Sequence, residues 1–325
     1  MPPPASPGGG GRLSLPAMEQ PDRTALVGGF YATAAFLFWG LSPIYFKLVG
    51  HVPADQVLAH RAVWSAILLA LLLTAMRRWP NVRALVGDRR QLLILLVTTL
   101  LISVNWFTFI WAIEVERVLE VSLGYYINPL VSVLLGMVFL RERLTLWQGA
   151  AVLLATAGVL NLAVEARGFP WVSLVLAFTF GFYGLLRKIA PVRPIEGLFV
   201  ETTLMAPVAL AYLALLDSQG SGSFGQLDLT TDGLLVLAGL VTTLPLLWFA
   251  SAARRLRLST VGLLHYIAPS CQILLAVFAY GEAFTTTHLI TFACIWTALA
   301  IYSASSLRRR AAPVDLAAAA KPRGR

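Results

Sequence analysis

The stretch LEVSLGYYINPLVSVLLGMVFLRERLT (119–145) is matched, 140 residues further along the chain, by STVGLLHYIAPSCQILLAVFAYGEAFT (259–285). Both copies contain Tyr-Ile-x-Pro, and Glu142 follows Pro129 at the same distance as Glu282 follows Pro269. Apolar matches between two hydrophobic segments arise easily by chance, but this spacing of Tyr, Pro and Glu does not. The sequence therefore indicates an internal duplication.

The composition places this duplication in a membrane. The chain has 325 residues, of which 58% are apolar and 13% charged, with a mean hydropathy of +0.75. An ordinary soluble domain carries about 25% charged residues. Apolar runs about 20 residues long match membrane-spanning helices, which satisfy their own backbone hydrogen bonds. We predict an all-α membrane protein with ten transmembrane helices at 25–49, 57–76, 91–113, 119–140, 145–164, 170–188, 197–216, 233–253, 261–280 and 287–306.

Each predicted repeat contains five spans, so the second repeat must enter the membrane from the opposite side. The repeats, 25–164 and 165–307, are thus expected to be inverted, an arrangement typical of secondary transporters with a central site between the halves. A Pro- and Gly-rich segment, 1–24, is expected to be disordered, and 308–325 to form a basic cytoplasmic tail. We expect translation to begin at Met18.

The distribution of positive charge predicts the orientation. Nearly all Lys and Arg residues fall on alternate connections, together with both termini. The positive-inside rule therefore places both termini in the cytoplasm of a bacterial cell, with the chain in the inner membrane. A net charge of +9 does not indicate a nucleic-acid partner, because the basic residues lie in short loops between spans. Cys271 and Cys294 lie within spans without metal-binding spacing, so we expect no metal and no cofactor.

Several stretches resemble a known family: FWGLSPIYFK (38–47), VPADQVLAHRAVWS (52–65), NWFTFIWA (105–112), LEVSLGYYINPLVSVLLGMVFLRERL (119–144) and RLRLSTVGLLHYIAP (255–269). They are similar to the RarD permeases, in the EamA branch of the drug/metabolite transporter superfamily. HRAVWS and GYYINP are the most specific blocks.

The resemblance covers almost the whole chain, from about Met18 to Leu307. It implies ten helices in inverted repeats, an inner-membrane location and an association with chloramphenicol sensitivity, which is a phenotype rather than a substrate. His265 departs from the family pattern, in which we expect Gln before Tyr-Ile. A titratable ring there would alter pH dependence or selectivity.

Two charged residues, Arg61 and Glu201, fall inside predicted spans at equivalent repeat positions. A charge at that depth needs a partner or a wet cavity. Inversion separates their depths by roughly 15 Å at about 1.5 Å per residue, which excludes a direct pair. We expect Arg61 in an outer vestibule near Glu120, and Glu201 in an inner one near Arg254 or Arg257. The alternative is that each residue only locks neighbouring helices.

We assign gating or coupling to Arg61 and Glu201 together with His60, Pro129 and Pro269. Histidine titrates near neutral pH and could relay protons, although helix–helix hydrogen bonding explains His60 equally well. Proline frees a backbone carbonyl, which is tolerated at mid-membrane where the backbone lines a cavity. A simple packing kink is the alternative for the two prolines.

Aromatic and amide side chains near mid-depth are the predicted substrate-binding residues. They are Tyr125, Tyr126, Asn128, His265, Tyr266, Gln272, Asn105, Trp106 and Trp64. Trp39, Tyr45 and Trp111 could line the same cavity. Ordinary packing and interfacial aromatic belts are the alternative for all of these rings.

The predicted function is a secondary transporter that moves a small metabolite or drug-like solute by alternating access. The chain contains no G-x-x-x-x-G-K-[ST] motif for ATP. A channel-like or regulatory membrane subunit is the main alternative, and an intramembrane enzyme using His60 or His265 with Glu201 is a further one. The expected partners are membrane lipid and the solute, with protons and a second copy of the chain as further candidates.

Overall fold

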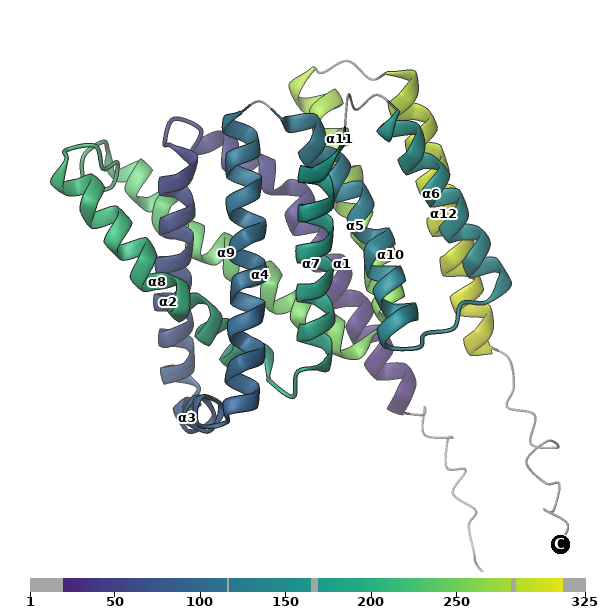
Figure 1. Ribbon diagram of the computed structural model, residues 1–325, viewed down its shortest axis with the longest axis horizontal. Coiled ribbons are helices and arrows are strands. Elements are labelled where there is room, and N and C mark those ends of the chain that lie inside the picture. The colour runs from purple at the N-terminus through teal and green to yellow at the C-terminus, as the bar shows by residue number, and fades with distance from the viewer. Residues whose placement is uncertain (1–19, 116, 165–168, 282–284, 312–325) are drawn as a thin grey trace, which may run out of the picture.

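A computed structural model describes residues 20–115, 117–164, 169–281 and 285–311, and all regular structure within these ranges is helical (Figure 1). The helices are α1 Gln20–Leu48, α2 Ala54–Ala75, α3 Trp79–Gly87, α4 Arg89–Glu114, α5 Val118–Phe139, α6 Leu146–Ala163, α7 Trp171–Ile189, α8 Pro194–Ser218, α9 Leu229–Arg255, α10 Leu258–His265, α11 Ile267–Tyr280 and α12 Thr286–Ala311. Within the described residues, ten segments are long and apolar enough to cross a membrane, and α10 with α11 forms one of them. The predicted ten spans are confirmed.

The helices at the two ends of the described chain extend beyond the predicted spans. The first begins at Gln20 and the last ends at Ala311, so 20–24 and 308–311 are helical. The remainder of the predicted disordered segment and basic tail, including Met18, lies outside the described residues.

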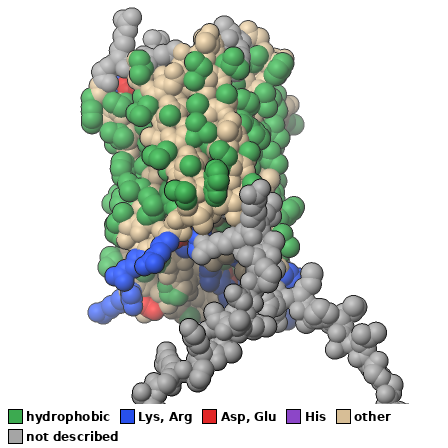
Figure 2. All heavy atoms as spheres, turned by 90° about the vertical axis from the view of Figure 1, so that its right-hand side faces the viewer, with side chains coloured by type: hydrophobic (Ala, Val, Ile, Leu, Met, Phe, Trp, Pro, Cys, Tyr) green, Lys and Arg blue, Asp and Glu red, His purple; other side chains and the backbone are tan. Residues whose placement is uncertain are grey.

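Polar and apolar side chains are separated along the long direction of the helices. On the face shown in Figure 2, a broad hydrophobic band lies above a region where Lys and Arg side chains gather. Many large apolar side chains on this bundle are solvent-exposed, among them Leu153, Val208 and Phe278. We call the end that carries α3 and the α7–α8 and α9–α10 connections the basic end. The exposed band is the surface expected to face lipid.

The two halves are packed into one another and do not form separate domains. A shift of 140 residues relates α1 to α7, α2 to α8, α4 to α9, α5 to α10–α11, and α6 to α12. The packing follows this relation: α1 packs on α9 as α4 packs on α7, and α5 packs on α7 as α11 packs on α1. Helices α2 and α8 contact each other, as do α6 and α12. The chain is therefore two inverted five-helix repeats around a shared core.

The repeats are in close contact where α5 crosses α10. A methyl group at Gly262 would lie 2.7 Å from the Pro129 carbonyl oxygen and 2.8 Å from Ser132 Cβ. Beside this crossing, the rings of Tyr126 and Tyr266 lie 6.4 Å apart and both side chains are buried. The seam between the halves is therefore filled with protein at this point.

The two equivalent prolines have different effects on their helices. Pro129 lies within the continuous helix α5, whereas the span that contains Pro269 is divided into α10 and α11. Proline at 269 cannot donate to the His265 carbonyl one turn earlier. At the break, the Tyr266 amide donates to the Leu263 carbonyl three residues earlier, as in a 3₁₀ turn, rather than four residues earlier as in an α-helix.

One helix was not predicted. Helix α3 lies at the basic end in a segment expected to be a loop, and it is too short to cross a membrane. Its residues Val82 and Leu85 are buried in a cluster with Leu73 and Leu95. The segment is helical because this small apolar face packs against the ends of the neighbouring spans.

Gly262→Ala should destabilise the protein, because the added methyl meets a backbone oxygen that cannot move independently of α5. Overpacking of this kind costs about 1–3 kcal/mol. Thermal unfolding in detergent measures the effect. Gly29→Ala is the control, since nothing lies within 4 Å of its added methyl. Equal stability of the two variants would show that the crossing is not tightly packed.

Candidate functional site

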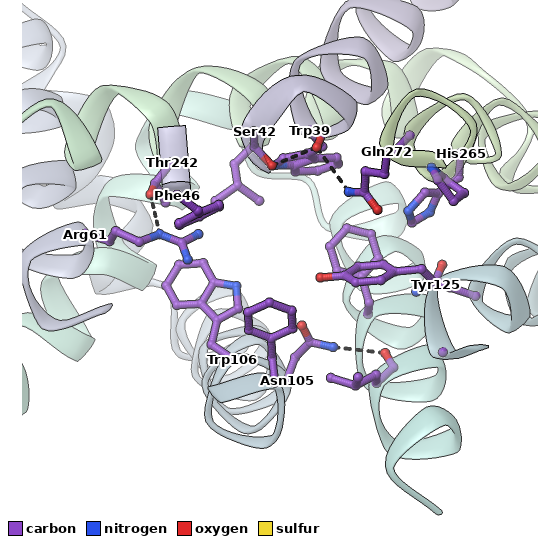
Figure 3. A pocket seen from close by; sticks show the side chains of 18 residues that line it. Trp39, Ser42, Phe46, Arg61, Asn105, Trp106, Tyr125, Thr242, His265 and Gln272 are labelled. Atoms are coloured by element: carbon purple, nitrogen blue, oxygen red, sulfur yellow. Dashed lines mark hydrogen bonds between the residues drawn. The ribbon is translucent and has the colours of Figure 1, made fainter. Parts of the chain in front are cut away.

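A central cavity of about 120 Å³ lies between the two halves (Figure 3). Helices α1, α2, α4 and α5 from the first half and α7, α9, α10 and α11 from the second contribute to its wall. Its lining includes Trp39, Ser42, Phe46, Arg61, Asn105, Trp106, Tyr125, Asn128, Phe180, Thr242, His265, Pro269 and Gln272. The cavity is thus formed where the inverted repeats meet.

The cavity continues into a larger vestibule of about 860 Å³. The two hollows share wall residues, among them Arg61, Trp106 and Tyr125. The vestibule extends to Gly50 and His51 in the α1–α2 connection, at the end opposite the basic end. A solute could therefore reach the cavity from that end.

Arg61 is the cation at the boundary between cavity and vestibule. Its Nε donates to Thr242 Oγ1 at 2.8 Å, and its guanidinium carbon lies 4.7 Å from the Trp106 ring centroid. The Phe46 ring is 5.6 Å away. No ion pair to Arg61 occurs among the described residues. Aromatic rings and one hydroxyl therefore hold this cation in place.

Glu120, which was predicted to lie near Arg61, forms its ion pair with a different arginine. Glu120 lies in the first turn of α5, where its carboxylate pairs with Arg117 at 3.0 Å and accepts from the Val172 amide at 3.3 Å. The connection that precedes α5 and the start of α7 supply these partners, so the carboxylate has partners other than Arg61.

The wall across the cavity from Arg61 is neutral and polar (Figure 3). Gln272 Nε2 donates to the Trp39 carbonyl at 3.3 Å, and Asn105 Nδ2 donates to the Leu176 carbonyl and to Thr179 Oγ1, both at 2.9 Å. Asn105 Nδ2 therefore has two protein acceptors, whereas Gln272 Nε2 has one. The carbonyl oxygens of these two amides remain as acceptors on this wall.

An aromatic layer separates the cavity from the basic end. His265 stacks on Phe36 with ring centroids 4.7 Å apart. Phe180 lies 5.1 Å from Phe249, and the Tyr183 ring lies parallel to Phe249 at 6.2 Å. On α7, Phe180 lines the cavity and Tyr183, one turn later, lies in this layer. The layer therefore closes the floor of the cavity.

A buried polar cluster lies beneath the aromatic layer. Glu201 accepts from Thr98 Oγ1 at 2.6 Å and from Tyr183 Oη at 3.2 Å, and it pairs with Arg187 at 3.5 Å. Both charged side chains of this pair are 2% exposed. Arg187 also donates to the Pro194 carbonyl at 3.1 Å. The cluster joins α4, α7 and α8 and seals the basic end.

The predicted partners of Glu201 are therefore wrong. Arg254 donates instead to the Val192 carbonyl, and Arg257 to the Arg143 carbonyl. Arg187, which lies in the last turn of α7, was not singled out from the sequence. One signal could have identified the pair. A cation lies in the last turn of α7 and an acid in the second turn of α8, and only a short connection separates the two helices.

The predicted substrate-binding residues fall into two groups. Those on the cavity wall are Asn105, Trp106, Tyr125, Asn128, His265 and Gln272. Tyr126 and Tyr266 are instead packed behind it, and Trp64 lies 5.9 Å from Phe224 in the α8–α9 connection. Tyr45 donates to the Leu234 carbonyl, and Trp111 packs on Trp171. Trp39 is on the wall.

The predicted gating and coupling residues are similarly divided. Arg61 and Pro269 line the cavity, whereas Glu201 lies in the seal below it. His60 lies next to Arg61 in the sequence, but adjacent residues of a helix point in different directions. The His60 ring therefore packs on Phe224, with ring centroids 5.2 Å apart. Pro129 lies at the α5–α10 crossing. Sequence reasoning missed Phe180 and Thr242, which are ordinary residues whose position on the wall depends on helix rotation.

These features define a multi-pass membrane protein with a cavity between two inverted halves. The EamA-like transporter family matches the chain twice, over residues 26–164 and 168–304. The chain therefore belongs to this family.

Its relatives are named as transporters or as RarD. An uncharacterized transporter of Vibrio cholerae is 49% identical, covering 90% of this chain and 96% of its own. Protein RarD of Escherichia coli is 44% identical, covering 85% and 93%. The chloramphenicol-sensitive protein RarD of Pseudomonas aeruginosa is 37% identical, covering 87% and 97%. The resemblance to RarD permeases is confirmed.

A solved structure described only as the crystal structure of a protein matches with a TM-score of 0.67. It is 19% identical in sequence, and the match covers 87% of this chain and 98% of that one. It supports the fold alone.

Arg187→Met should destabilise the protein by about 3–5 kcal/mol, because it leaves the Glu201 carboxylate buried without its cation. The double variant Arg187→Met/Glu201→Leu should recover most of this loss. Thermal unfolding in detergent compares the variants. Arg117→Met, which breaks an exposed pair, should cost about 0–1 kcal/mol. Equal losses in the single and double Arg187 variants would contradict the pairing.

Proposed function

We propose that this transporter moves a small solute across the bacterial inner membrane by alternating access between its inverted repeats. One observation carries the proposal: a cavity between the repeats opens to one end and is closed at the other by two layers of side chains. A carrier needs such a cavity in each of its states, with the barrier on alternating sides. The inverted halves provide the symmetry for that exchange.

Orientation follows from the positive charge. The positive-inside rule assigns the basic end to the cytoplasm, so the vestibule faces outward in this state. The aromatic layer and the Arg187–Glu201 pair then form the cytoplasmic barrier. The ion pair must separate or move for the solute to leave inward. Coupling of this movement to protons remains a prediction.

A channel is the competing proposal. A channel needs one continuous path at the moment of conduction. Across the described residues, the path from the vestibule ends at the stacked rings of His265 and Phe36. This closed floor favours the carrier.

Counterflow in proteoliposomes tests the proposal. Purified protein is first screened by thermal stability against amino acids, metabolites and amphiphilic antibiotics, because a bound ligand raises apparent stability. Chloramphenicol belongs in the screen, since one relative is named for sensitivity to it. A carrier preloaded with unlabelled ligand should accumulate labelled ligand transiently. Simple equilibration without an overshoot would support the channel.

Cysteine labelling should detect the closed cytoplasmic barrier without a known solute. In a variant lacking Cys271 and Cys294, Ser122→Cys in the vestibule should react with an impermeant maleimide applied from outside the cell. Ser251→Cys, in the hollow at the basic end, should react only from inside. The two sites are controls for each other. Equal labelling of both from one side would contradict the barrier or the orientation.

A further inference from the structure

We propose that the transported solute carries an anionic group, a carboxylate or a phosphate, that binds Arg61. The inference rests on the proposed transport function and specifies its substrate class. It starts from a charge that has no counter-charge. Arg61 is the only Asp, Glu, Lys or Arg on the cavity wall, and the vestibule wall adds no acidic residue among the described residues.

The contrast with the second buried arginine supports this reading. Arg187 has a protein carboxylate, Glu201, at 3.5 Å. Arg61 occupies the position in the first repeat that Glu201 occupies in the second, and it has a hydroxyl and aromatic rings for neighbours. A charge within a bilayer is costly unless it is paired or lies in a wet cavity. The open cavity supplies the water in this state, and a bound anion would supply the pair.

The fixed orientation of Arg61 suits recognition of an anion. Thr242 holds Nε and the guanidinium carbon lies over the Trp106 ring, so the fork is positioned before a ligand arrives. In Figure 3 the terminal nitrogens extend past Thr242 into the region above Trp106. A guanidinium binds carboxylate or phosphate oxygens through two parallel hydrogen bonds. Its terminal nitrogens face the space that a solute would fill.

The rest of the cavity defines the body of the solute. Trp39, Phe109 and Phe180 supply apolar and aromatic surface between Arg61 and the far wall. Asn105 donates to two protein acceptors and Gln272 to one, and both amides leave their oxygens as acceptors. The site therefore fits a small amphipathic anion with an apolar or aromatic body and a hydrogen-bond donor at its other end. Uncharged amphiphiles would lack the contact to Arg61.

The test uses probes that share one body and differ in charge. Phenylacetate and phenyl phosphate carry the anion, phenylacetamide is neutral, and 2-phenylethylammonium is a cation. Thermal shift and tryptophan fluorescence titrations of the purified full chain measure binding. We expect the anions to bind and raise the melting temperature, with weak or no binding of the other two. Phenylacetate and phenyl phosphate together decide between carboxylate and phosphate.

Two variants and a control assign the effect to Arg61. Arg61→Gln should weaken anion binding on the order of 30-fold or more, as when one partner of a buried charged contact is removed. Arg61→Lys keeps the charge without the fork and should lose less. Lys47→Gln removes an exposed cation that does not line the cavity and should leave binding unchanged.

Each outcome decides the inference. Equal binding of amide and anion, anion binding that survives Arg61→Gln, or no anion-dependent shift in the wild-type protein would overturn it. The wild-type comparison holds even if Arg61→Gln does not fold. Counterflow separates this inference from the transport proposal. If an anion binds through Arg61 but is never exchanged, the anion-binding inference stands and the transport proposal fails. If Arg61→Gln still exchanges a neutral solute, the transport proposal stands and the anion-binding inference fails.

Discussion

The structure depends on one constraint: a polar or charged group inside the bilayer must find a partner or water. The spans satisfy their backbone groups as helices. The two charged residues at equivalent repeat positions satisfy the constraint in different ways. Glu201 is enclosed by Arg187, Thr98 and Tyr183, whereas Arg61 is open to a cavity. The closed end of the protein therefore contains the paired charge of Glu201, and the open end leads to the charge of Arg61, which has no acidic partner.

The symmetry of the fold explains why one framework can have a closed and an open end. Helices α1 and α7 run in opposite directions and are related by the repeat, and each packs against the other half. The crossing at Gly262 and Pro129 lies between the two related helices α5 and α10 and is packed too closely for a side chain. The two halves are thus in close contact at this crossing and enclose the cavity elsewhere.

The sequence predicted the spans, the duplication and the inversion, because these depend on length, hydropathy and repetition. It also identified much of the cavity wall, since Asn105 and Gln272 are polar groups at mid-depth. It could not place Tyr126, which lies one residue from Tyr125 yet faces away from the cavity. Helix rotation decides between such neighbours, and apolar residues on every face hide that rotation. The Arg187–Glu201 pair was missed because it depends on packing between two helices.

Cross-linking at the basic end tests the central claim of alternating access most directly. Asn81 of the first half donates to the Glu196 carboxylate of the second half at 3.1 Å, so cysteines at these two positions can join the halves through a short reducible reagent. Binding and exchange of a stabilising solute are then measured on the same linked protein in proteoliposomes. The account predicts that the linked protein still binds the solute from the open side but no longer exchanges it. Reduction of the cross-link should restore exchange. Exchange by the linked protein at the unlinked rate would contradict it.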